Sequence, residues 1–251
     1  MYSILQSYLT NRYFRTKYRE AYSSLRPILA VVPQGNVPSP LLYLIYTADL
    51  PTLANSTTAT FADDIAILMV YENLTMAVHR LHLHLNKIQS WLKTWRMKAN
   101  EAKSVQVTFT LSKMTCSPVK LNNEQLPQAD EVKYLGIHLD QRLTRRKHIA
   151  TKRKQLDLKL QNLYWIIGRK SQLSLENKLL VYKVILKPVW TYGIQLWGTA
   201  SNSNLEILER FQSKVLRIIR DAPWYIPNTV IKRDLQIPTV KQEARKYSVN
   251  Y

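Results

Sequence analysis

Residues 59–70 read ATFADDIAILMV, and this stretch decides the fold that the sequence predicts. Two short apolar runs, residues 59–62 and 65–70, flank the acidic pair Asp63 and Asp64. Short apolar runs on either side of a polar turn are typical of a β-hairpin. We therefore predict a hairpin that carries both carboxylates at its tip.

The acidic pair has a restricted chemistry. Adjacent carboxylates at a tight turn point in different directions, and they cannot both be buried without a counter-charge, so they need water or a divalent metal. Clustered oxygen ligands in a basic chain suit metal-dependent phosphoryl transfer. Asp-Asp is also a common surface-turn dipeptide, and one pair is too few to hold two metal ions. The pair alone therefore leaves an ordinary solvated turn open.

A second turn lies upstream, where residues 32–42 read VPQGNVPSPLL. Gly35 would let the backbone approach a ligand closely, because it has no side chain. A helix is expected to begin after Pro38 or Pro40, since proline is favoured near a helix start. We expect that helix to end at Asp49, which precedes Leu50 and another proline.

Downstream of the hairpin, apolar residues recur at 78, 81, 85, 88, 92 and 95. Spacings of three and four place all six on one stripe of a long helix, with Trp91 and Trp95 expected in the core. Alternation over 105–111 predicts a strand, and 132–139 predicts another that is broken by Gly136. We expect both strands to extend a sheet that the long helix covers.

Beyond residue 140 the pattern becomes helical. Helices are predicted over 144–167, 174–187 and 203–220, the last opened by a capping box of Ser203 and Glu206. Residues 223–251 show little periodicity, so we expect only a peripheral tail. The predicted class is α+β: an antiparallel sheet with packed helices over 1–140, an α-helical part over 141–222, and the tail over 223–251.

Charge is the largest global signal in this chain of 251 residues, since 36 Lys and Arg against 17 Asp and Glu give a net charge of +19. Residues 141–187 hold thirteen basic residues and two acids, a local net charge of +11. Such a surface attracts polyanions, and nucleic acid is the expected partner. The alternative is a ribosomal-like or ordinary basic protein with solvated helix faces.

Several classes are disfavoured. The single cysteine, Cys116, excludes an internal disulfide and a cysteine-based zinc site. His79, His82 and His84 make a weak zinc candidate, because 84 lies well round the helix from the other two. No stretch reaches the roughly 18 apolar residues of a membrane span, and the polar start does not read as a signal peptide. We expect an intracellular protein of the nucleus, the cytoplasm or both, with no membrane partner.

The motifs in this order resemble one family. A Pro-Gln-Gly turn, a helix that ends in Asp-Leu-Pro and a Phe-Ala-Asp-Asp hairpin are similar to the palm of reverse transcriptases from non-LTR retrotransposons, particularly the jockey-like elements of insects. Further matches are NEAKS at 100–104, YLGIHLD at 134–140, Tyr-Gly at 192–193 and Trp-Gly at 197–198. The resemblance runs from about residue 4 to residue 235.

The resemblance implies a polymerase palm, a helical thumb and an RNA-directed DNA polymerase activity. RNA template, DNA primer and dNTPs would be the partners, and two Mg²⁺ or Mn²⁺ ions the cofactors. Asp63 and Asp64 would be catalytic and bind the metal, with Phe61 and Ala62 beside them at the nucleotide and primer end.

Other site residues follow from the same resemblance. Gln34 and Gly35 would line the nucleotide and template pocket, and Leu135 and Gly136 would form the primer grip. Lys103 would protonate the leaving pyrophosphate, although a solvated lysine at a strand entrance fits it equally well. Basic residues of the thumb would contact nucleic acid: Arg145, Arg146, Lys147, Lys152, Arg153 and Lys154.

The chain also departs from the family pattern. The family has a further catalytic aspartate several tens of residues before the Pro-Gln-Gly turn, and we expect this chain to begin after it and after the fingers. Asp49 follows the turn and cannot substitute. Val31 and Pro38 replace a glycine and a leucine of the usual turn. We therefore expect little or no polymerase activity from this chain alone; a non-catalytic nucleic-acid-binding remnant is the main alternative, and a nuclease that uses the pair is more distant.

Overall fold

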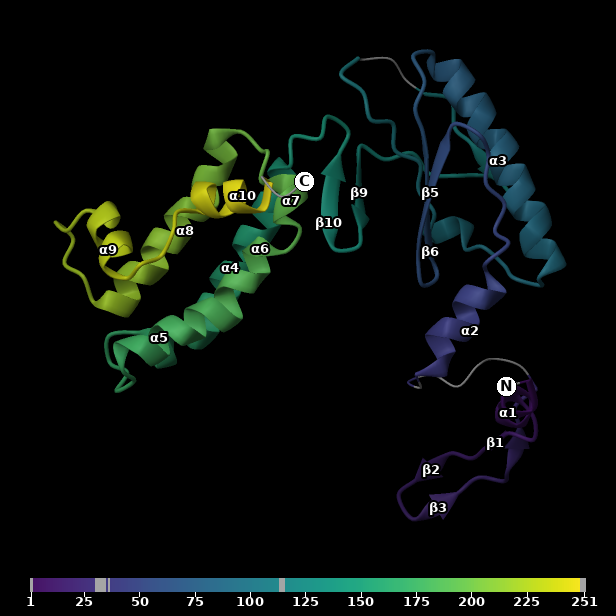
Figure 1. Cartoon of the computed structure of the whole chain (residues 1–251), viewed down its shortest axis with the longest axis horizontal. Helices are drawn as coiled ribbons and strands as arrows, with labels where there is room; N and C mark the ends of the chain where they lie inside the picture. Colours follow the sequence, from purple (N-terminus) through teal and green to yellow (C-terminus); the bar gives the residue numbers. More distant parts are fainter. Residues whose placement is uncertain (1, 30–34, 36, 113–115, 249–251) are drawn as a thin grey trace. The chain divides into compact units, whose positions relative to one another are not determined.

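The computed structural model describes residues 2–29, 35, 37–112 and 116–248 (Figure 1). The chain forms two compact units, residues 1–100 with 119–125 and residues 101–118 with 126–251. Helices and small antiparallel sheets occur together, and each sheet has two strands. The predicted α+β class is confirmed at this level, whereas the names palm and thumb stay predictions. Within the part of the chain described here, no helix is both long and apolar enough to cross a membrane.

The first unit alternates short strands with three helices in its described part. Its elements are α1 (Tyr2–Leu9), β1 (Tyr13–Phe14), β2 (Lys17–Tyr18), β3 (Ala21–Tyr22), β4 (Arg26–Pro27), α2 (Pro38–Tyr46), β5 (Ser56–Phe61), β6 (Asp64–Met69), α3 (Leu74–Thr94), β7 (Lys120–Leu121) and β8 (Glu124–Gln125). The antiparallel pairs are β1 with β4, β2 with β3, β5 with β6 and β7 with β8.

Helix α3 confirms the long helix that the apolar spacing predicts. Its amino end is capped by Asn73, whose side chain accepts a hydrogen bond from the Thr75 amide at 2.9 Å. All six positions of the predicted stripe are buried or half-buried, with Leu85 and Ile88 the most deeply buried. The helix packs against β6 and β7. It therefore covers one side of the β5–β6 hairpin that carries the acidic pair.

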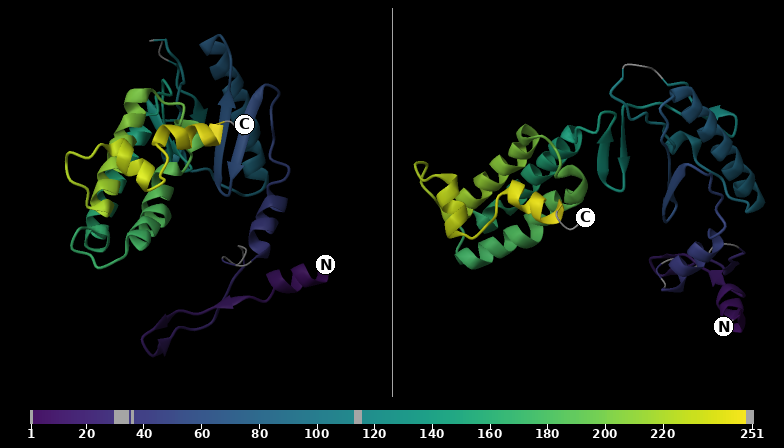
Figure 2. Two further views of the ribbon diagram at one scale, coloured as in Figure 1. Left: turned by 60° about the vertical axis from the view of Figure 1, so that its left-hand side comes forward. Right: turned by 45° about the horizontal axis from the view of Figure 1, so that its top comes forward.

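The second unit is mostly helical. It contains the 3₁₀ helix η1 (Glu101–Lys103), β9 (Glu131–Tyr134), β10 (Ile137–Asp140), α4 (Arg146–Ile167), α5 (Leu175–Val181), the π-helix η2 (Tyr182–Leu186), α6 (Lys187–Thr191), α7 (Ile194–Trp197), α8 (Asn202–Arg220), α9 (Asn228–Asp234) and α10 (Val240–Ser248). Helix α4 contacts α6 and α8, and both views of Figure 2 show α4 and α8 lying side by side.

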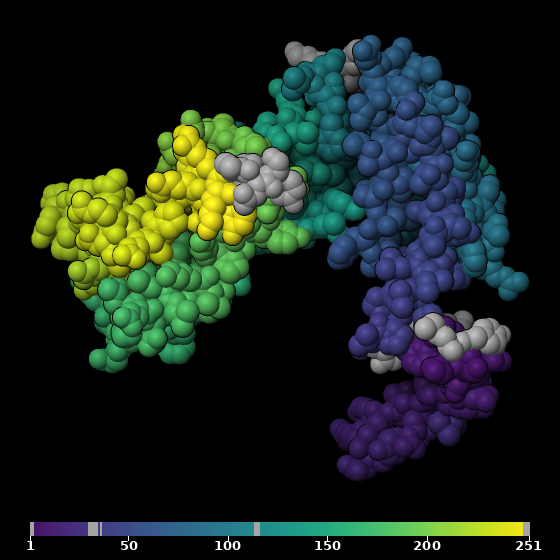
Figure 3. All heavy atoms as spheres, in the orientation of Figure 1, coloured from purple at the N-terminus to yellow at the C-terminus, as the bar shows by residue number. Residues whose placement is uncertain are grey.

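The main hydrophobic core lies among these helices. Helix α8 supplies buried side chains three and four residues apart: Leu205, Leu208, Phe211, Gln212, Val215, Leu216 and Ile219. Such spacing gives one apolar face, which packs against Leu156 of α4, Tyr182 of η2 and Trp190 of α6. Trp190 and Trp197 are fully buried, so both indoles belong to the core. Figure 3 shows the helices from α4 to α10 as one continuous body.

The strand predicted over 105–111 is wrong. Only Gln106 makes a β-bridge there, with Gln128, and the burial is the reverse of the predicted pattern. Gln106 is buried, while Leu111 is 82% exposed. The side-chain amide of Gln106 donates to the Ser117 carbonyl at 3.2 Å. A polar contact with the following loop therefore decides which side of this segment faces inward, and the apolar alternation does not.

The region 132–139 is a hairpin, not one strand that joins a larger sheet. Strands β9 and β10 pair with each other and with no other strand in the described residues. Leu135 and Gly136 both have positive φ, at 46° and 78°. Positive φ at both central residues is the geometry of a two-residue type I′ turn, which reverses the chain. The glycine that was expected to interrupt a strand instead completes a turn.

Two helix boundaries also differ from expectation. The capping box at Ser203 and Glu206 is wrong, because α8 begins at Asn202 after Ser201, and Ser203 lies inside the helix. The helix predicted over 174–187 begins at Leu175 after a Ser174 cap, and the chain stays helical through η2 and α6 to Thr191. Because Pro188 lies in the first turn of α6, it does not need a free amide hydrogen there.

The expectation of a peripheral tail is wrong as well. Residues 228–248 contain α9 and α10, and this segment buries side chains in the main core from both helices and from the link between them: Ile231, Leu235, Ile237, Val240 and Ala244. The two helices have seven and nine residues. Each is too short for a periodic pattern to stand out, so their burial depends on the α8 face that receives them.

Candidate active site and nucleic-acid interface

The acidic pair lies where the hairpin pattern predicts it. Phe61 at the end of β5 pairs with Asp64 at the start of β6, so Ala62 and Asp63 form a two-residue turn. Ala62 has a positive φ of 50°, which is uncommon for a residue with a side chain. Both aspartates are exposed at the tip. The hairpin with two solvent-facing carboxylates is therefore confirmed.

The surroundings of the pair come partly from α2. Burial, and then the negative charge of Asp63, raise the pKa of Tyr43 above its ordinary value. Tyr43 on α2 thus lies within electrostatic range of the hairpin tip. Phe61 is 62% exposed beside it. The exposed Phe61 ring and the two exposed carboxylates therefore share this region with the half-buried Tyr43.

The Pro-Gln-Gly turn is only partly described. Gln34, predicted to line a nucleotide and template pocket, lies outside the described residues. Gly35 has a φ of 83°, and a Cβ built there would meet nothing within 4 Å. Its backbone conformation, not crowding, is what favours glycine at this position.

Asp49 has a structural role. Its carboxylate accepts hydrogen bonds from the indole nitrogens of Trp91 at 2.9 Å and Trp95 at 3.2 Å. The Tyr46 hydroxyl also donates to the Trp95 carbonyl at 2.7 Å. These bonds fasten the end of α2 to the end of α3 and occupy both carboxylate oxygens. The expectation that Asp49 does not replace a metal ligand stays a prediction.

Two histidines of the weak zinc candidate are engaged elsewhere. A ring nitrogen of His84 lies 2.9 Å from the Pro51 carbonyl oxygen, and the ring is fully buried. The Nε2 atom of His82 accepts a hydrogen bond from the Lys120 amide at 2.9 Å. The described residues contain no group of three or more His, Cys, Asp or Glu side chains able to hold a metal ion.

Lys103 ends the short η1 helix in the second unit, and its side chain is exposed. Asp63 and Asp64 belong to the first unit. The role in pyrophosphate release therefore stays a prediction.

The tip of the β9–β10 hairpin is held by a residue that sequence reasoning did not single out. The Tyr192 hydroxyl donates to the Leu135 carbonyl at 2.6 Å, across 57 positions of the chain. A Cβ at Gly136 would lie 3.3 Å from Cε1 of the same ring. Gly136 is thus required both by its positive φ and by the close tyrosine. The sequence marked Tyr192 and Gly193 as a family motif, but it did not indicate that Tyr192 contacts Leu135.

Gly193 completes this contact. A Cβ there would come 2.7 Å from Cδ1 of Ile137 on β10, and the residue has a φ of 66°. Lys152 of α4 lies over the Tyr192 ring, with its ammonium nitrogen 5.1 Å from the ring centre. The hairpin therefore packs closely on the turn between α6 and α7.

A buried histidine contacts β10 of the same hairpin. The His138 amide donates to Nδ1 of His148 at 3.3 Å, and His148 is fully buried. Burial, then the positive charges of Lys152 and His138, lower the pKa of His148 to about 4. The ring is therefore neutral near pH 7, as a partner of a backbone amide must be to accept its hydrogen.

The six basic residues predicted to contact nucleic acid differ in availability. Arg153 forms a two-pronged ion pair with Asp157, at 2.9 and 3.0 Å. Arg145 donates to the backbone carbonyls of Leu143, just before α4, and of Leu196 in α7. Lys147 pairs with Glu131 at 3.1 Å. The side chains of Arg146 and Lys154 are exposed and form no ion pair within the described residues. Of the six, Arg146 and Lys154 are therefore the most available to bind phosphate.

Comparison with known proteins gives the class. Residues 2–139, more than half of the chain, match the family model described as reverse transcriptase (RNA-dependent DNA polymerase). The chain belongs to the reverse transcriptase family. Its relatives define the branch, which is that of jockey-like non-LTR retrotransposons.

Three relatives from Drosophila melanogaster each align over 100% of this chain. The probable RNA-directed DNA polymerase from transposon X-element is 38% identical over 255 residues, with 28% of its own length covered. The probable RNA-directed DNA polymerase from transposon BS is 37% identical, with 29% covered. The RNA-directed DNA polymerase from mobile element jockey is 34% identical, with 28% covered. The chain thus spans less than a third of these relatives, and no solved structure matches it.

Proposed function

We propose that this chain forms the later palm and the thumb of an RNA-directed DNA polymerase, which extends a DNA primer on an RNA template with dNTPs. The observation that carries the proposal is the exposed Asp63 and Asp64 pair at a hairpin tip, inside the segment that matches the reverse transcriptase family. Exposed adjacent carboxylates remain available to a bound ion or substrate.

Asp63 and Asp64 fit Mg²⁺ or Mn²⁺ in kind, because carboxylate oxygens are the ligands that these ions prefer. In the whole enzyme, bound ions would supply activation of the primer 3′-hydroxyl and charge stabilisation of the pyrophosphate. Phe61 would support the nucleotide or primer end, and Ala62 leaves room there because its side chain is small. Gln34 and Gly35 would line the template and nucleotide side, and Lys103 would give a proton to pyrophosphate.

Leu135 and Gly136 would hold the primer end through the backbone of the type I′ turn. Main-chain contacts fix position without reading sequence, which suits a polymerase that must accept every primer. Tyr192 would act as a positioning residue, because it holds the Leu135 carbonyl. Arg146 and Lys154 would contact phosphates of the duplex.

We further propose that this chain alone does not extend a primer. Carboxylates are the right type of ligand for these metal ions, but the chain supplies two of them where the family site uses three. This part of the proposal is supported by the described residues, in which no third ligand joins the pair.

Primer extension tests both parts. The chain alone, mixed with primed RNA template, Mg²⁺ and dNTPs, should yield no product. A fusion that places it after the upstream reverse transcriptase segment of the X-element relative should extend the primer, and Asp63→Asn in the fusion should abolish extension. Extension by the unfused chain that Asp63→Asn abolishes would overturn the inactivity proposal; an inactive, folded fusion would overturn the polymerase proposal.

A second candidate is a nucleic-acid-binding remnant without catalysis. The net charge of +11 over residues 141–187 favours it, because phosphate binding needs only this charge. Under this alternative, the fusion binds primed template but does not extend it. Asp63→Asn would then leave every measured property unchanged.

A further inference from the structure

A groove between α8, α9 and α10 lies in the part of the chain that follows the family match. It has a volume of about 920 Å³ and belongs entirely to the second unit. Cations from two helices line it: Arg210, Lys214 and Arg217 from α8, and Lys232 and Arg233 from α9. Glu209 is its one acidic lining residue among those described. The groove is therefore strongly positive.

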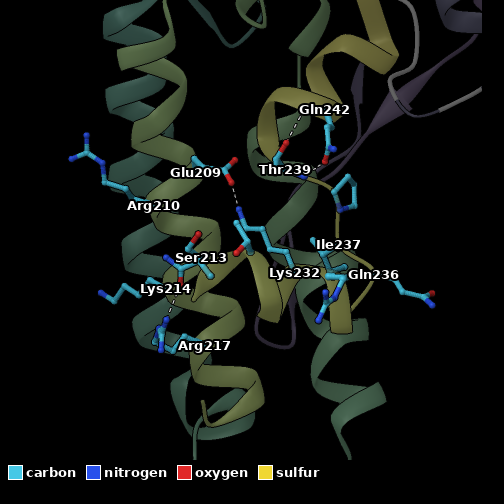
Figure 4. Close-up of a pocket in the computed structure, with 14 residues that line it drawn as sticks. Glu209, Arg210, Ser213, Lys214, Arg217, Lys232, Gln236, Ile237, Thr239 and Gln242 are labelled. Atoms are coloured by element: carbon cyan, nitrogen blue, oxygen red, sulfur yellow. Dashed lines mark hydrogen bonds and ion pairs between the residues drawn. The ribbon is translucent and has the colours of Figure 1, made fainter. Parts of the chain in front are cut away.

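The negative charge of Glu209 is already balanced by an ion pair with Lys232. Lys232 is buried and forms an ion pair with Glu209, and burial lowers the pKa of Lys232 to about 8. The other Glu209 oxygen accepts the Val240 amide hydrogen at 2.7 Å, at the start of α10. Figure 4 shows this pair inside the groove. It fixes α9 and α10 on α8 and leaves the remaining cations without an internal counter-charge in the groove.

The remaining cations lie on the rim. Arg210 and Lys214 extend outward along α8, away from the Lys232–Glu209 pair (Figure 4). Lys214 forms no ion pair within the described residues, and Arg210 and Arg233 make only exposed pairs with Glu206 and Asp234, at 3.4 and 3.7 Å. Exposed pairs of this kind contribute little. A phosphate backbone can therefore replace them at small cost.

The loop bonded to Arg217, a lining residue of the groove, holds two exposed aromatic rings. Arg217 donates to the carbonyls of Pro223 and Ile226, at 2.6 and 2.7 Å, and so fixes the loop between them at the groove. Trp224 and Tyr225 on that loop are 89% and 68% exposed, and their rings meet edge to face at 6.1 Å. Two exposed rings beside a cationic groove are suited to a ligand that carries both phosphates and stacking rings.

We infer that this groove binds a single-stranded segment of nucleic acid, with phosphates along Arg210, Lys214 and Arg233 and bases stacked on Trp224 and Tyr225. A positive groove with aromatic stacking platforms is how proteins hold single strands without reading sequence. In a duplex the bases are already stacked in pairs, so exposed rings add nothing to its binding. The site is separate from the predicted α4 contacts and does not depend on polymerase activity.

The test uses the full chain and a labelled oligouridine of about sixteen nucleotides, with fluorescence anisotropy as the readout. Trp224→Ala with Tyr225→Ala should weaken binding at least about 25-fold, because two stacks are lost and each costs about fivefold or more. Trp224→Phe with Tyr225→Phe keeps two stacking rings and should bind like the unmodified chain. An RNA duplex of the same length should bind equally well to all three proteins.

Charge is tested with matched reversals. Lys214→Glu with Arg233→Glu should weaken oligouridine binding and make the slope of log K against log salt shallower by about 1.4, the value for two phosphate contacts on a single strand. Lys241→Glu with Lys246→Glu, an equal change on exposed α10 positions, should leave that slope unchanged. Circular dichroism melts establish that each variant is folded.

Some outcomes would overturn the inference. If the two charge-reversal double variants lost oligouridine affinity equally, binding would depend on net charge alone. If the variant without the two aromatic rings kept its affinity, there would be no stacking site. A loss confined to Arg146→Glu with Lys154→Glu would also overturn the groove, while leaving the function proposed for the palm and thumb intact.

Discussion

Two residues with side chains take up positive φ at the tips of the two hairpins that carry candidate site residues. Ala62 has a φ of 50° and Leu135 a φ of 46°. Left-handed conformations cost a non-glycine residue about 1 kcal/mol or more, so surrounding structure must hold them in place. At Leu135 the hydrogen bond from Tyr192 does so. Strained backbone positions of this kind often coincide with functional sites. This agrees with the roles proposed for the hairpin of Ala62 in metal binding and for Leu135 in holding the primer.

The conformation of Ala62 predicts the effect of a glycine. Ala62→Gly should raise the free energy of unfolding by up to about 1 kcal/mol, because glycine takes positive φ without a steric penalty. Chemical denaturation followed by far-UV circular dichroism measures the change. Ala59→Gly, in the middle of β5, is the control and should destabilise the chain. A loss of stability in Ala62→Gly equal to the control would contradict the stated conformation.

Tyr192→Phe removes one hydroxyl and leaves the ring in place. The Leu135 carbonyl then lacks its donor, which should cost about 1 kcal/mol and loosen the turn. Hydrogen exchange of the β9 and β10 amides should become faster. Tyr164→Phe, which removes an exposed hydroxyl on α4, should leave those amides unchanged. Unaltered exchange at the turn in Tyr192→Phe would show that packing alone holds the hairpin.

At the scale of elements, periodic patterns predicted those structures whose burial depends on one long face. The stripe at residues 78–95 was correctly assigned to a helix because 21 residues of α3 repeat the same spacing. The acidic hairpin was predicted because apolar runs and turn chemistry agree. The strand prediction for residues 105–111 failed because the buried Gln106, and not the apolar alternation, determines which side of the segment faces inward. The contact of Tyr192 with Leu135 could not be predicted, since nothing local links positions 57 residues apart.

The junction of β10 and α4 should make stability depend on pH. The pKa of His148 is about 4 in the folded chain and about 6.5 as the ordinary value. As pH falls, the unfolded chain therefore takes up this proton at a higher pH than the folded chain does. The stabilisation that comes from the neutral His148 ring is fully present above about pH 6.5 and is lost as the pH falls towards about 4. The loss should reach up to about 3 kcal/mol. The His138 pKa is lowered as well, mainly by burial, and acts in the same direction.

Urea denaturation at several pH values between 4 and 7 measures this dependence. His148→Gln keeps an acceptor for the His138 amide but cannot take up a proton, so its stability should fall less steeply over the same range. Asp140 does not obscure the result. Burial raises its pKa, but the hydrogen bonds from Thr144 and Arg145 together outweigh burial and hold the pKa below its ordinary value of 3.8, so its contribution is lost only in more acidic solution. Equal slopes for both proteins would exclude His148 as the cause.

At the scale of the whole molecule, the two units differ in how much apolar surface they bury. The second unit has a core cluster of twenty buried residues. Among described residues of the first unit, only Leu85, Ile88, Val119 and Leu121 are buried apolar side chains. Burial supplies most of the free energy of folding, so the units should not be equally stable. The acidic hairpin belongs to the weaker one.

Native-state hydrogen exchange should reveal this difference. Amides of α8 should be protected at least about tenfold more strongly than those of β5 and β6, because local opening needs less energy where little apolar surface is buried. In a fusion with an upstream segment of a relative, protection of β5 and β6 should increase if that segment packs on the hairpin. Equal protection in both units of the unfused chain would contradict a difference in stability.

The tyrosine that touches Gly136 also has an evolutionary consequence. Since a side chain at 136 would crowd the ring at 192 and would also strain the positive-φ backbone, the two positions should change together among the copies of such an element. Copies under selection should keep the pair or lose it jointly, whereas decaying copies should accumulate mismatched pairs. The proportion of mismatches in a genome would then record how long ago transposition ceased.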